Sequence, residues 1–256
     1  MEMIDTHCHL DLPVFDHDRD AVWERARRVG VRQCVIPAIR VAGFAKVAAM
    51  ASPQFPIALG LHPWYLPDHP ADAVSRLEGW LARCRPVAIG EMGLDHKVPP
   101  ESHAAQQILF IDQLLLAKRH KLPLLLHVRG AHDTVCSQLR KHAFTCGGIV
   151  HAFNGSLQQA HAYLDLGFRL GFGGVVTHDR AQRVRRVAAA LPDHALVLET
   201  DAPDLPPAGH TGERNEPAHL AMVVATLAGL RGVEPGCIIE QTTQNATTVL
   251  QLIRPA

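Results

Sequence analysis

Short apolar runs alternate with longer stretches of helical periodicity along the chain, and this alternation constrains the fold most strongly. The runs are continuously apolar, which is typical of strands covered on both faces. Strands alternating with helices imply parallel strands joined by right-handed crossovers. The expected strands are Met3–Cys8, Gln33–Pro37, Phe55–Leu59, Pro86–Gly90, Leu122–His127, Gly148–His151, Arg169–Gly171 and Leu196–Glu199. The helix candidates are Asp18–Val29, Ala71–Arg83, Glu101–His120, Ala131–Lys141, Leu157–Leu166 and Arg180–Ala190.

Two α/β architectures are compatible with this pattern. Eight such units in about 200 residues fit a closed (β/α)8 TIM barrel. An open doubly wound sheet would normally carry a glycine-rich phosphate loop after its first strand, where this chain has His7-Cys8-His9. The glycines at 171, 173 and 174 follow the seventh strand and form no G-x-G-x-x-G. We therefore favour a barrel, as one domain over residues 1–256 that ends in two helices between Glu216 and Ile253.

Two local features give more detailed predictions about the helices. In the Glu101–His120 segment, Ile108, Ile111, Leu115 and Lys118 recur at spacings of three and four, which predicts an amphipathic helix. Glu216 stands directly before Pro217, so we expect a helix N-cap there with proline in the first turn.

The charge balance excludes some classes of partner. Lys plus Arg is 25 and Asp plus Glu is 25, so the chain lacks the basic excess of proteins that coat long nucleic acids or anionic membranes. We expect no membrane association and see no sign of an obligate protein partner. The acidic, His-rich start is unlike a signal peptide, and the 6 cysteines form no C-x-x-C. These features predict a cytoplasmic protein with reduced, mostly buried thiols.

The expected strand ends carry mainly imidazoles and carboxylates, in a chain with 17 histidines. Active sites of barrels lie at the carboxyl ends of the strands. Those ends supply Asp5, His7, His9, His62, Glu91, His127, His151, Glu199 and Asp201. His7 and His9 are two residues apart on a strand, so they point to the same side and form a chelating pair for a transition metal. A lone histidine at such a place is more often a hydrogen-bonded core residue, so the combination carries the prediction.

Four histidines and two carboxylates exceed what one tetrahedral zinc needs and fit two adjacent divalent ions. Glu91 is the natural bridging ligand, because its strand lies between those of the other ligands around the barrel. Two such ions form a clamp for phosphoryl transfer or hydrolysis. Asp201 could bind metal and also accept a proton from the attacking water. A simple turn at the end of the strand remains an alternative interpretation of Asp201.

Several segments, in order along the chain, resemble the TatD family of metal-dependent deoxyribonucleases, within which the YjjV type of bacterial hydrolase is the most similar. They are Asp5–Asp11, Gly60–Pro63, Gly90–Asp95, Leu126–Arg129, Val150–Ser156, Glu199–Pro203, Arg214–Pro217 and Asn245–Ala246. The resemblance implies a TIM barrel of the metallo-dependent hydrolase type and 3′ exonuclease activity on single-stranded DNA. It also implies a first metal held by His7, His9, Glu91 and Asp201, and a second held by Glu91, His127 and His151. The departures from the family pattern (Val128, Ala152, Asn154, His96 and Lys97) remove no ligand but flank the pocket.

Further cationic or histidine residues are candidates for binding phosphate. His62 and Arg129 lie beside the metal ligands and are expected to contact substrate, with a loop histidine and a surface arginine as the alternatives. Arg214 is a candidate for phosphate binding or for bracing a helix start.

The expected function is metal-dependent hydrolysis of DNA ends or short oligonucleotides, using two divalent ions (Zn²⁺, Mn²⁺ or Mg²⁺). Asp201 and Glu91 are the catalytic candidates. Balanced charge favours recognition of ends, because extended phosphate contacts need many basic residues. The alternative is a small-molecule metallohydrolase acting on an amide, ester or phosphoester with the same centre. A non-catalytic scaffold is disfavoured, because a full ligand set with a candidate base is unnecessary for scaffolding.

Overall fold

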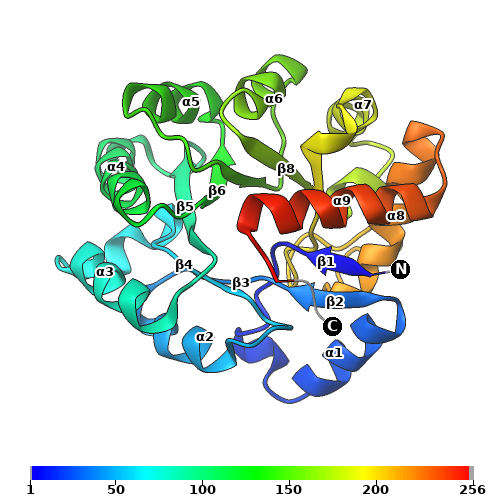
Figure 1. The fold of residues 1–256 in the computed structure, drawn as a ribbon, viewed down its shortest axis with the longest axis horizontal. Helices are drawn as coiled ribbons and strands as arrows, with labels where there is room; N and C mark the ends of the chain where they lie inside the picture. The colour runs from blue at the N-terminus through cyan, green and yellow to red at the C-terminus, as the bar shows by residue number, and fades with distance from the viewer. Residues whose placement is uncertain (1, 254–256) are drawn as a thin grey trace.

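A computed structural model, which describes residues 2–253, is a closed barrel of parallel strands surrounded by helices (Figure 1). The strands are β1 (Met3–Asp5), β2 (Val31–Cys34), β3 (Ile36–Ala38), β4 (Ile57–Leu59), β5 (Ala88–Asp95), β6 (Leu124–Arg129), β7 (Gly148–His151), β8 (Phe168–Phe172) and β9 (Leu196–Leu198). β1 pairs with β2, and β3 to β9 pair in sequence order, always in parallel. The Thr6 N–H donates to the Leu198 carbonyl at 2.9 Å, which joins the last strand to the first. This confirms the predicted (β/α)8 barrel.

The second barrel strand is divided in two at Val35. The predicted run Gln33–Pro37 spans the end of β2 and the start of β3. The Val35 N–H donates to the Asp5 carbonyl at 2.8 Å, and the Val35 carbonyl accepts from the Cys8 N–H at 3.1 Å. These bonds keep β2 and β3 in one barrel wall alongside the segment that carries His7 and His9.

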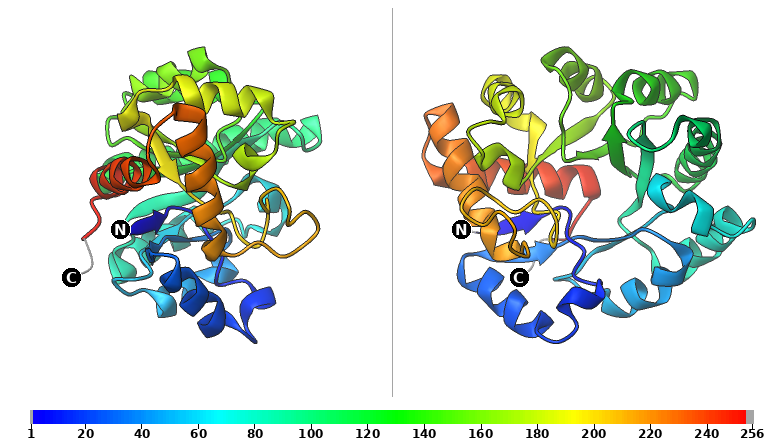
Figure 2. Two further views of the ribbon diagram at one scale, coloured as in Figure 1. Left: turned by 90° about the vertical axis from the view of Figure 1, so that its right-hand side faces the viewer. Right: turned by 180° about the vertical axis from the view of Figure 1, so that it is seen from behind.

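Helices form the outer ring, and the last helix closes one end of the barrel (Figures 1 and 2). They are α1 (Arg19–Arg28), α2 (Phe44–Met50), α3 (Ala73–Cys84), α4 (His103–His120), α5 (His132–Lys141), α6 (Leu157–Leu164), α7 (Gln182–Ala190), α8 (Leu220–Arg231) and α9 (Pro235–Leu250). Of these, α2 is absent from the predicted helices, whereas α8 and α9 are the two expected closing helices. Within the described part of the chain, no single helix is long and apolar enough to cross a membrane. The bent pair Pro217–Arg231 and Pro235–Leu250 would pass by length and composition alone.

The barrel interior beside α9 is filled by apolar side chains. One residue from each of seven barrel strands packs against α9 and the residues that follow it. The cluster is Ile4, Val35, Ala58, Ala88, Leu125, Ile149, Val197, Ala246, Leu250 and Leu252. Since this end is occupied by a packed core, the carboxyl ends of the strands at the opposite end are left to form a site.

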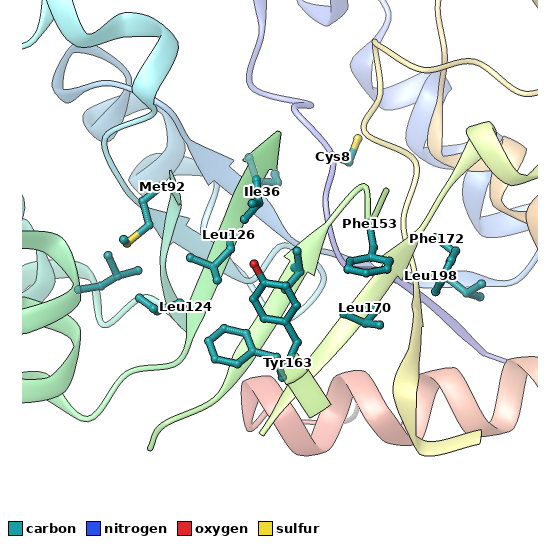
Figure 3. Packing of buried hydrophobic residues seen from close by; sticks show 14 of the residues in the cluster. Cys8, Ile36, Met92, Leu124, Leu126, Phe153, Tyr163, Leu170, Phe172 and Leu198 are labelled. Carbon is teal, nitrogen blue, oxygen red and sulfur yellow. The ribbon is translucent and has the colours of Figure 1, made fainter. Parts of the chain in front are cut away.

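A larger core lies between the outer face of the strands and the helices. In β6, Leu124 and Leu126 belong to this outer core, while Leu125 belongs to the interior cluster. Leu126 and the fully buried Tyr163 of α6 both belong to this outer core (Figure 3). Alternate residues of a strand face opposite sides, so His127, two residues after Leu125, also faces the interior.

The buried face of α4 differs from the prediction. Ile108 is 64% exposed and Leu115 is 37% exposed, while Gln113 is completely buried. The Gln113 amide binds the backbone of Leu61, accepting from its N–H at 2.8 Å and donating to its carbonyl at 3.1 Å. Phe110 and Leu114 are buried with it. The amphipathic assignment was wrong because satisfied glutamines occupy the inner face, a pattern that hydrophobic periodicity misses.

Two arginine pairs tie α1 to the start of the turn before α8. Arg214 donates to both carboxylate oxygens of Asp18, at 2.9 and 2.6 Å, which favours its role as a brace. Glu216 precedes Pro217 in the predicted N-cap position, but its side chain makes no capping bond. Instead the Glu216 carboxylate accepts from Arg25 at 2.6 Å. Arg214 is therefore engaged in the fold itself.

Candidate metal centre

The six predicted ligands meet at the end of the barrel opposite α9. His127 within β6 and His151 at the end of β7 face the interior, two residues beyond the interior residues Leu125 and Ile149. Glu91 lies within β5. The remaining three ligands, His7, His9 and Asp201, follow β1 and β9. Strands distant in sequence thus bring imidazoles and carboxylates together, as predicted.

Glu91 lies between two groups of histidines, and each of its oxygens faces one group. Its Oε2 is 3.2 Å from His7 Nε2 and 3.4 Å from His9 Nε2. Its Oε1 is 3.1 Å from His127 Nδ1 and 3.2 Å from His62 Nε2. Glu91 is 3% exposed, so this carboxylate has little access to water. A carboxylate with one oxygen in each group has the arrangement of a bridging ligand.

Asp201 lies on the other side of the His7 and His9 pair. Its Oδ1 is 3.7 Å from Nε2 of both residues and 3.5 Å from His151 Nε2. The His7 and His151 rings stack with their centroids 3.7 Å apart. The Asp201 side chain is 15% exposed, against 4% for Glu91. Of the two carboxylates, Asp201 therefore has the better access to water from the cavity.

The carboxylates and imidazoles of the cluster shift one another's pKa. Burial lowers the pKa of His7, helped by the charge of His151, so its imidazole is neutral and retains a lone pair. Burial alone would raise the pKa of Glu91, but His62 and His7 hold it well below its usual range. Burial would likewise raise the pKa of Asp201, but His151 lowers it. For His9, His127 and His151 burial alone would lower the pKa, but the nearby carboxylates raise it, for His9 to about 9. A divalent transition metal bound here would displace these protons, because imidazole binds metal in its neutral form.

Of the four sets of donor atoms among the described residues that are close enough to hold an ion, three lie within this cluster; the fourth set, Asp5, Cys8 and Cys34, contains no predicted ligand. His7, His9 and Asp201 form one set, and His7, Glu91 and His151 form another. The third set consists of Glu91, His127 and His62, which was expected to contact phosphate. His7 Nε2 and His9 Nε2 lie 3.3 Å apart. Their proximity to each other and to Glu91 and Asp201 fits ions seated among them, and the geometry adds His62 to the candidate ligands.

Two buried carboxylates outside the predicted ligand set position the histidines. Asp95 Oδ2 lies 2.9 Å from His127 Nε2, on the side of the ring away from Glu91. Glu199 Oε1 lies 3.1 Å from His151 Nδ1 and accepts from the Ala152 N–H at 2.6 Å. Such outer contacts fix the ring orientation of metal-binding histidines. Both carboxylates belong to the family motifs. Their contacts to the histidines could not be predicted, because contacts between distant strands produce no local sequence pattern.

Asp5 joins the two segments that carry His7 and Asp201. Its carboxylate accepts from the Thr200 hydroxyl at 2.6 Å, from the Thr200 N–H at 3.0 Å and from the His7 N–H at 3.2 Å. Burial raises the pKa of Asp5 to about 7, although these bonds oppose the rise. The Asp201 N–H in turn donates to the His7 carbonyl at 2.8 Å. Asp5 thus positions the backbone of the two segments that carry the predicted ligands His7 and Asp201, and is not itself one of the predicted ligands.

A cavity of about 510 Å³ opens beside the cluster. His62, Glu91, His127, His151 and Asp201 line it together with many apolar side chains. The predicted substrate contact Arg129 also lines it, at an exposed position. It is the only arginine or lysine among the cavity-lining residues that the structure describes. A bound molecule would therefore meet one permanent cation beside the metal ligands.

Comparisons with known proteins agree with the geometry. Residues 4–251 match the family described as TatD-related DNase. The uncharacterized metal-dependent hydrolase YjjV of Escherichia coli (strain K12) is 43% identical over 251 residues, covering 96% of each chain. The crystal structure of YjjV from this strain matches with a TM-score of 0.94 and 40% identity, covering 98% of each chain. The 3′-5′ ssDNA/RNA exonuclease TatD of Pantoea ananatis (strain LMG 20103) is 31% identical, covering 98% of this chain and 100% of that protein. The chain is therefore a metal-dependent hydrolase that belongs to the family of TatD-related DNases.

Proposed function

We propose that the chain is a two-metal phosphodiesterase that removes nucleotides from the 3′ end of single-stranded DNA or of short oligonucleotides. The position of Glu91, with one oxygen in each histidine group, is the observation that supports two ions most directly. A relative named as a 3′-5′ ssDNA/RNA exonuclease supports the substrate. We also propose one domain over residues 1–256 and a cytoplasmic location, which the six free cysteines support.

The proposed ligands are those expected from the sequence. His7, His9, Glu91 and Asp201 would hold the first ion, and Glu91, His127 and His151 the second. Zn²⁺, Mn²⁺ and Mg²⁺ are the candidate ions. When bound, such a pair activates water and neutralises charge that develops on a phosphoryl group. The contacts that Asp95 and Glu199 make to His127 and His151 would keep these rings aimed at the site.

The chain's own residues supply the remaining steps. Asp201 is ionised and has access to the cavity, so its carboxylate can accept the proton of the attacking water. The Arg129 guanidinium offers a fork of N–H donors to the phosphate oxygens. His62 either contacts the same phosphate or joins Glu91 and His127 as a ligand.

The test is a time course on a 5′-labelled single-stranded oligonucleotide with added Mg²⁺ or Mn²⁺, beside a circular form of the same sequence. We expect the linear strand to shorten one nucleotide at a time and the circle to stay intact. Glu91→Ala and Asp201→Asn should abolish or greatly slow shortening. Glu240→Ala, at an exposed position of α9, is the matched control and should behave as the wild type. Cleavage of the circle would refute exonuclease action, and full activity of Glu91→Ala would refute the bridging role.

One observation favours a second candidate function, hydrolysis of a small ester, amide or phosphoester. Arg129 is the only permanent cation among the described residues around the cavity, which suits a small substrate as well as a chain end. An intact oligonucleotide in a protein with bound metal, together with turnover of small esters, would support this candidate.

A further inference from the structure

Trp64 stands at the mouth of the candidate site with an exposed indole ring. The ring belongs to the 3-10 segment Pro63–Asp68, directly after His62, and lines the cavity. Its residue is 52% exposed, whereas the other tryptophans, Trp23 and Trp80, are partly buried and pack on the core. Packing does not explain why so large an aromatic ring is half exposed beside the candidate site, because burying the ring would stabilise the protein more.

The indole is held in place by a buried carboxylate. Its Nε1–H donates to Asp95 Oδ2 at 2.7 Å, and Asp95 is completely buried. The Asp95 carboxylate also accepts from the Lys97 N–H at 2.7 Å and lies 2.9 Å from His127 Nε2. The Asp95 N–H donates to the Gln106 amide oxygen at 2.8 Å. Rotating the indole away would remove one hydrogen-bond donor from the buried Asp95 carboxylate. The ring is therefore held in place before any ligand binds.

About half of Trp64 is exposed, and its hydrogen bond does not use the ring faces. The hydrogen bond to Asp95 uses the edge of the ring, since Nε1–H lies in the ring plane. The nearest rings, His62 and His127, have centroids 6.2 and 6.5 Å away at steep angles of 88° and 64°. Among the residues that the structure describes, no ring stacks parallel on Trp64 and no cation lies over it. A flat ligand could therefore stack on the exposed part of the indole without competing with another aromatic ring or a cation among the described residues.

The surroundings define the ligand. The candidate metal ligands and Arg129 line the same cavity as Trp64, and they suit a single anionic phosphoryl group. Elsewhere the cavity wall is apolar, including Ile39, Val128 and Phe153. One anionic group joined to one flat ring within a cavity of about 510 Å³ describes a single nucleotide unit. Stacking on an aromatic ring discriminates little between bases, because every base has a π face.

We propose that Trp64 is the stacking platform for the base of the 3′-terminal nucleotide, whose phosphodiester lies at the metal cluster. This inference rests on the proposed function. Hydrolysis adds water across that phosphodiester, leaving a 3′-hydroxyl on the shortened strand and the phosphate on the released nucleotide. Trp64 takes no part in the proton transfer. It affects the affinity for the substrate and the preference for a terminal residue that carries a base.

Two 5′-labelled thymidine oligonucleotides, identical except for a base or an abasic tetrahydrofuran at the 3′-terminal residue, provide the test. For the wild type we expect kcat/KM for the first cut to be about 5- to 150-fold higher with the base present, the range that corresponds to one stacked base. Trp64→Ala should reduce this ratio to near 1, mainly through KM. Trp64→Phe keeps a ring face and should retain a clear preference, and Trp80→Phe serves as the matched control.

A purely structural role for Trp64, acting through Asp95 and His127, makes a different prediction. It would slow cleavage of both oligonucleotides equally and would weaken Mn²⁺ binding, measured by calorimetric titration. Equal slowing of both substrates in Trp64→Phe and Trp64→Ala, or an unchanged base preference in Trp64→Ala, would overturn the inference. Equal cleavage of both oligonucleotides by the wild type would also overturn it while leaving the exonuclease function intact.

A binding experiment distinguishes failure of this inference from failure of the proposed function. Thymidine 5′-monophosphate and deoxyribose 5-phosphate are titrated into the Mn²⁺-loaded wild type and Trp64→Ala. A preference of the wild type for the nucleotide that disappears in Trp64→Ala would support the platform even if no oligonucleotide is cut. No preference in the wild type would overturn the platform whatever the cleavage assay shows.

Discussion

Gly171 makes room for a buried carboxylate, and replacing it should disturb both stability and metal binding. A Cβ added at Gly171 would lie 2.1 Å from Glu199 Oε2, in the barrel interior. The carboxylate must then retreat by about 1.3 Å to reach the 3.4 Å of ordinary contact. Such a shift strains the Glu199 contacts to the Ala152 N–H and to His151. Overpacking costs about 1–3 kcal/mol and a lost charged hydrogen bond about 1.5–3 kcal/mol.

For Gly171→Ala we therefore expect a loss of about 2.5–6 kcal/mol in the free energy of unfolding. In a chain of this length, that loss lowers Tm by about 5–24 °C. Loss of the His151 orientation should weaken Mn²⁺ binding by about 10- to 100-fold. Thermal unfolding of the metal-free protein and calorimetric titration measure the two effects. Gly229→Ala, in α8 with open space around the new Cβ, is the control and should not destabilise. Wild-type Tm and affinity in Gly171→Ala would refute the reasoning, whereas recovery of Tm in Gly171→Ala with Glu199→Asp would support it.

Further predictions concern metal binding and pH. Mn²⁺ at about 100 times its Kd should raise the stability of the wild type by about 2.7 kcal/mol, or Tm by about 5–10 °C, as followed by fluorescence melting with and without EDTA. The same rise in Glu91→Ala would contradict the shared ligand. His62→Ala should bind fewer ions by elemental analysis if His62 is a ligand; an unchanged metal content with a raised KM would identify it as a phosphate contact. Hydrogen bonding to Arg214 lowers the pKa of Asp18 in the folded state. That stabilisation is present above the unfolded pKa and disappears as the pH falls through the folded pKa. The Tm deficit of Asp18→Asn should therefore shrink between about pH 6 and about pH 3, and a constant deficit would count against the pair.

The barrel and the ligand cluster could be predicted because both depend on short-range patterns. Continuous apolar runs mark strands buried on both faces, and strand ends in a barrel converge. This reasoning predicted that His127 and His151 lie together from their places at the ends of runs, and the structure brings both to the same end of the barrel. The α2 helix is absent from the predictions, and it is only seven residues long (Phe44–Met50).

The features that escaped prediction depend on contacts between distant segments. Gln113 is buried because its amide satisfies the backbone of Leu61, and no periodicity reveals that pairing. Asp95 and Glu199 contact His127 and His151 from the opposite side of each ring. The role of Trp64 depends on the same kind of pairing, with a carboxylate 31 residues away.

The closure of β1 against β9 has a consequence for the order of events during synthesis. His7 and His9 leave the ribosome early, while Asp201, whose N–H binds the His7 carbonyl, follows only after most of the chain has been made. Until then β1 lacks one neighbour and the first candidate ion lacks one ligand. An ion held by His7, His9 and Asp201 would therefore be bound only late in synthesis. A fragment ending before β9 would carry the histidine pair but could not complete its coordination.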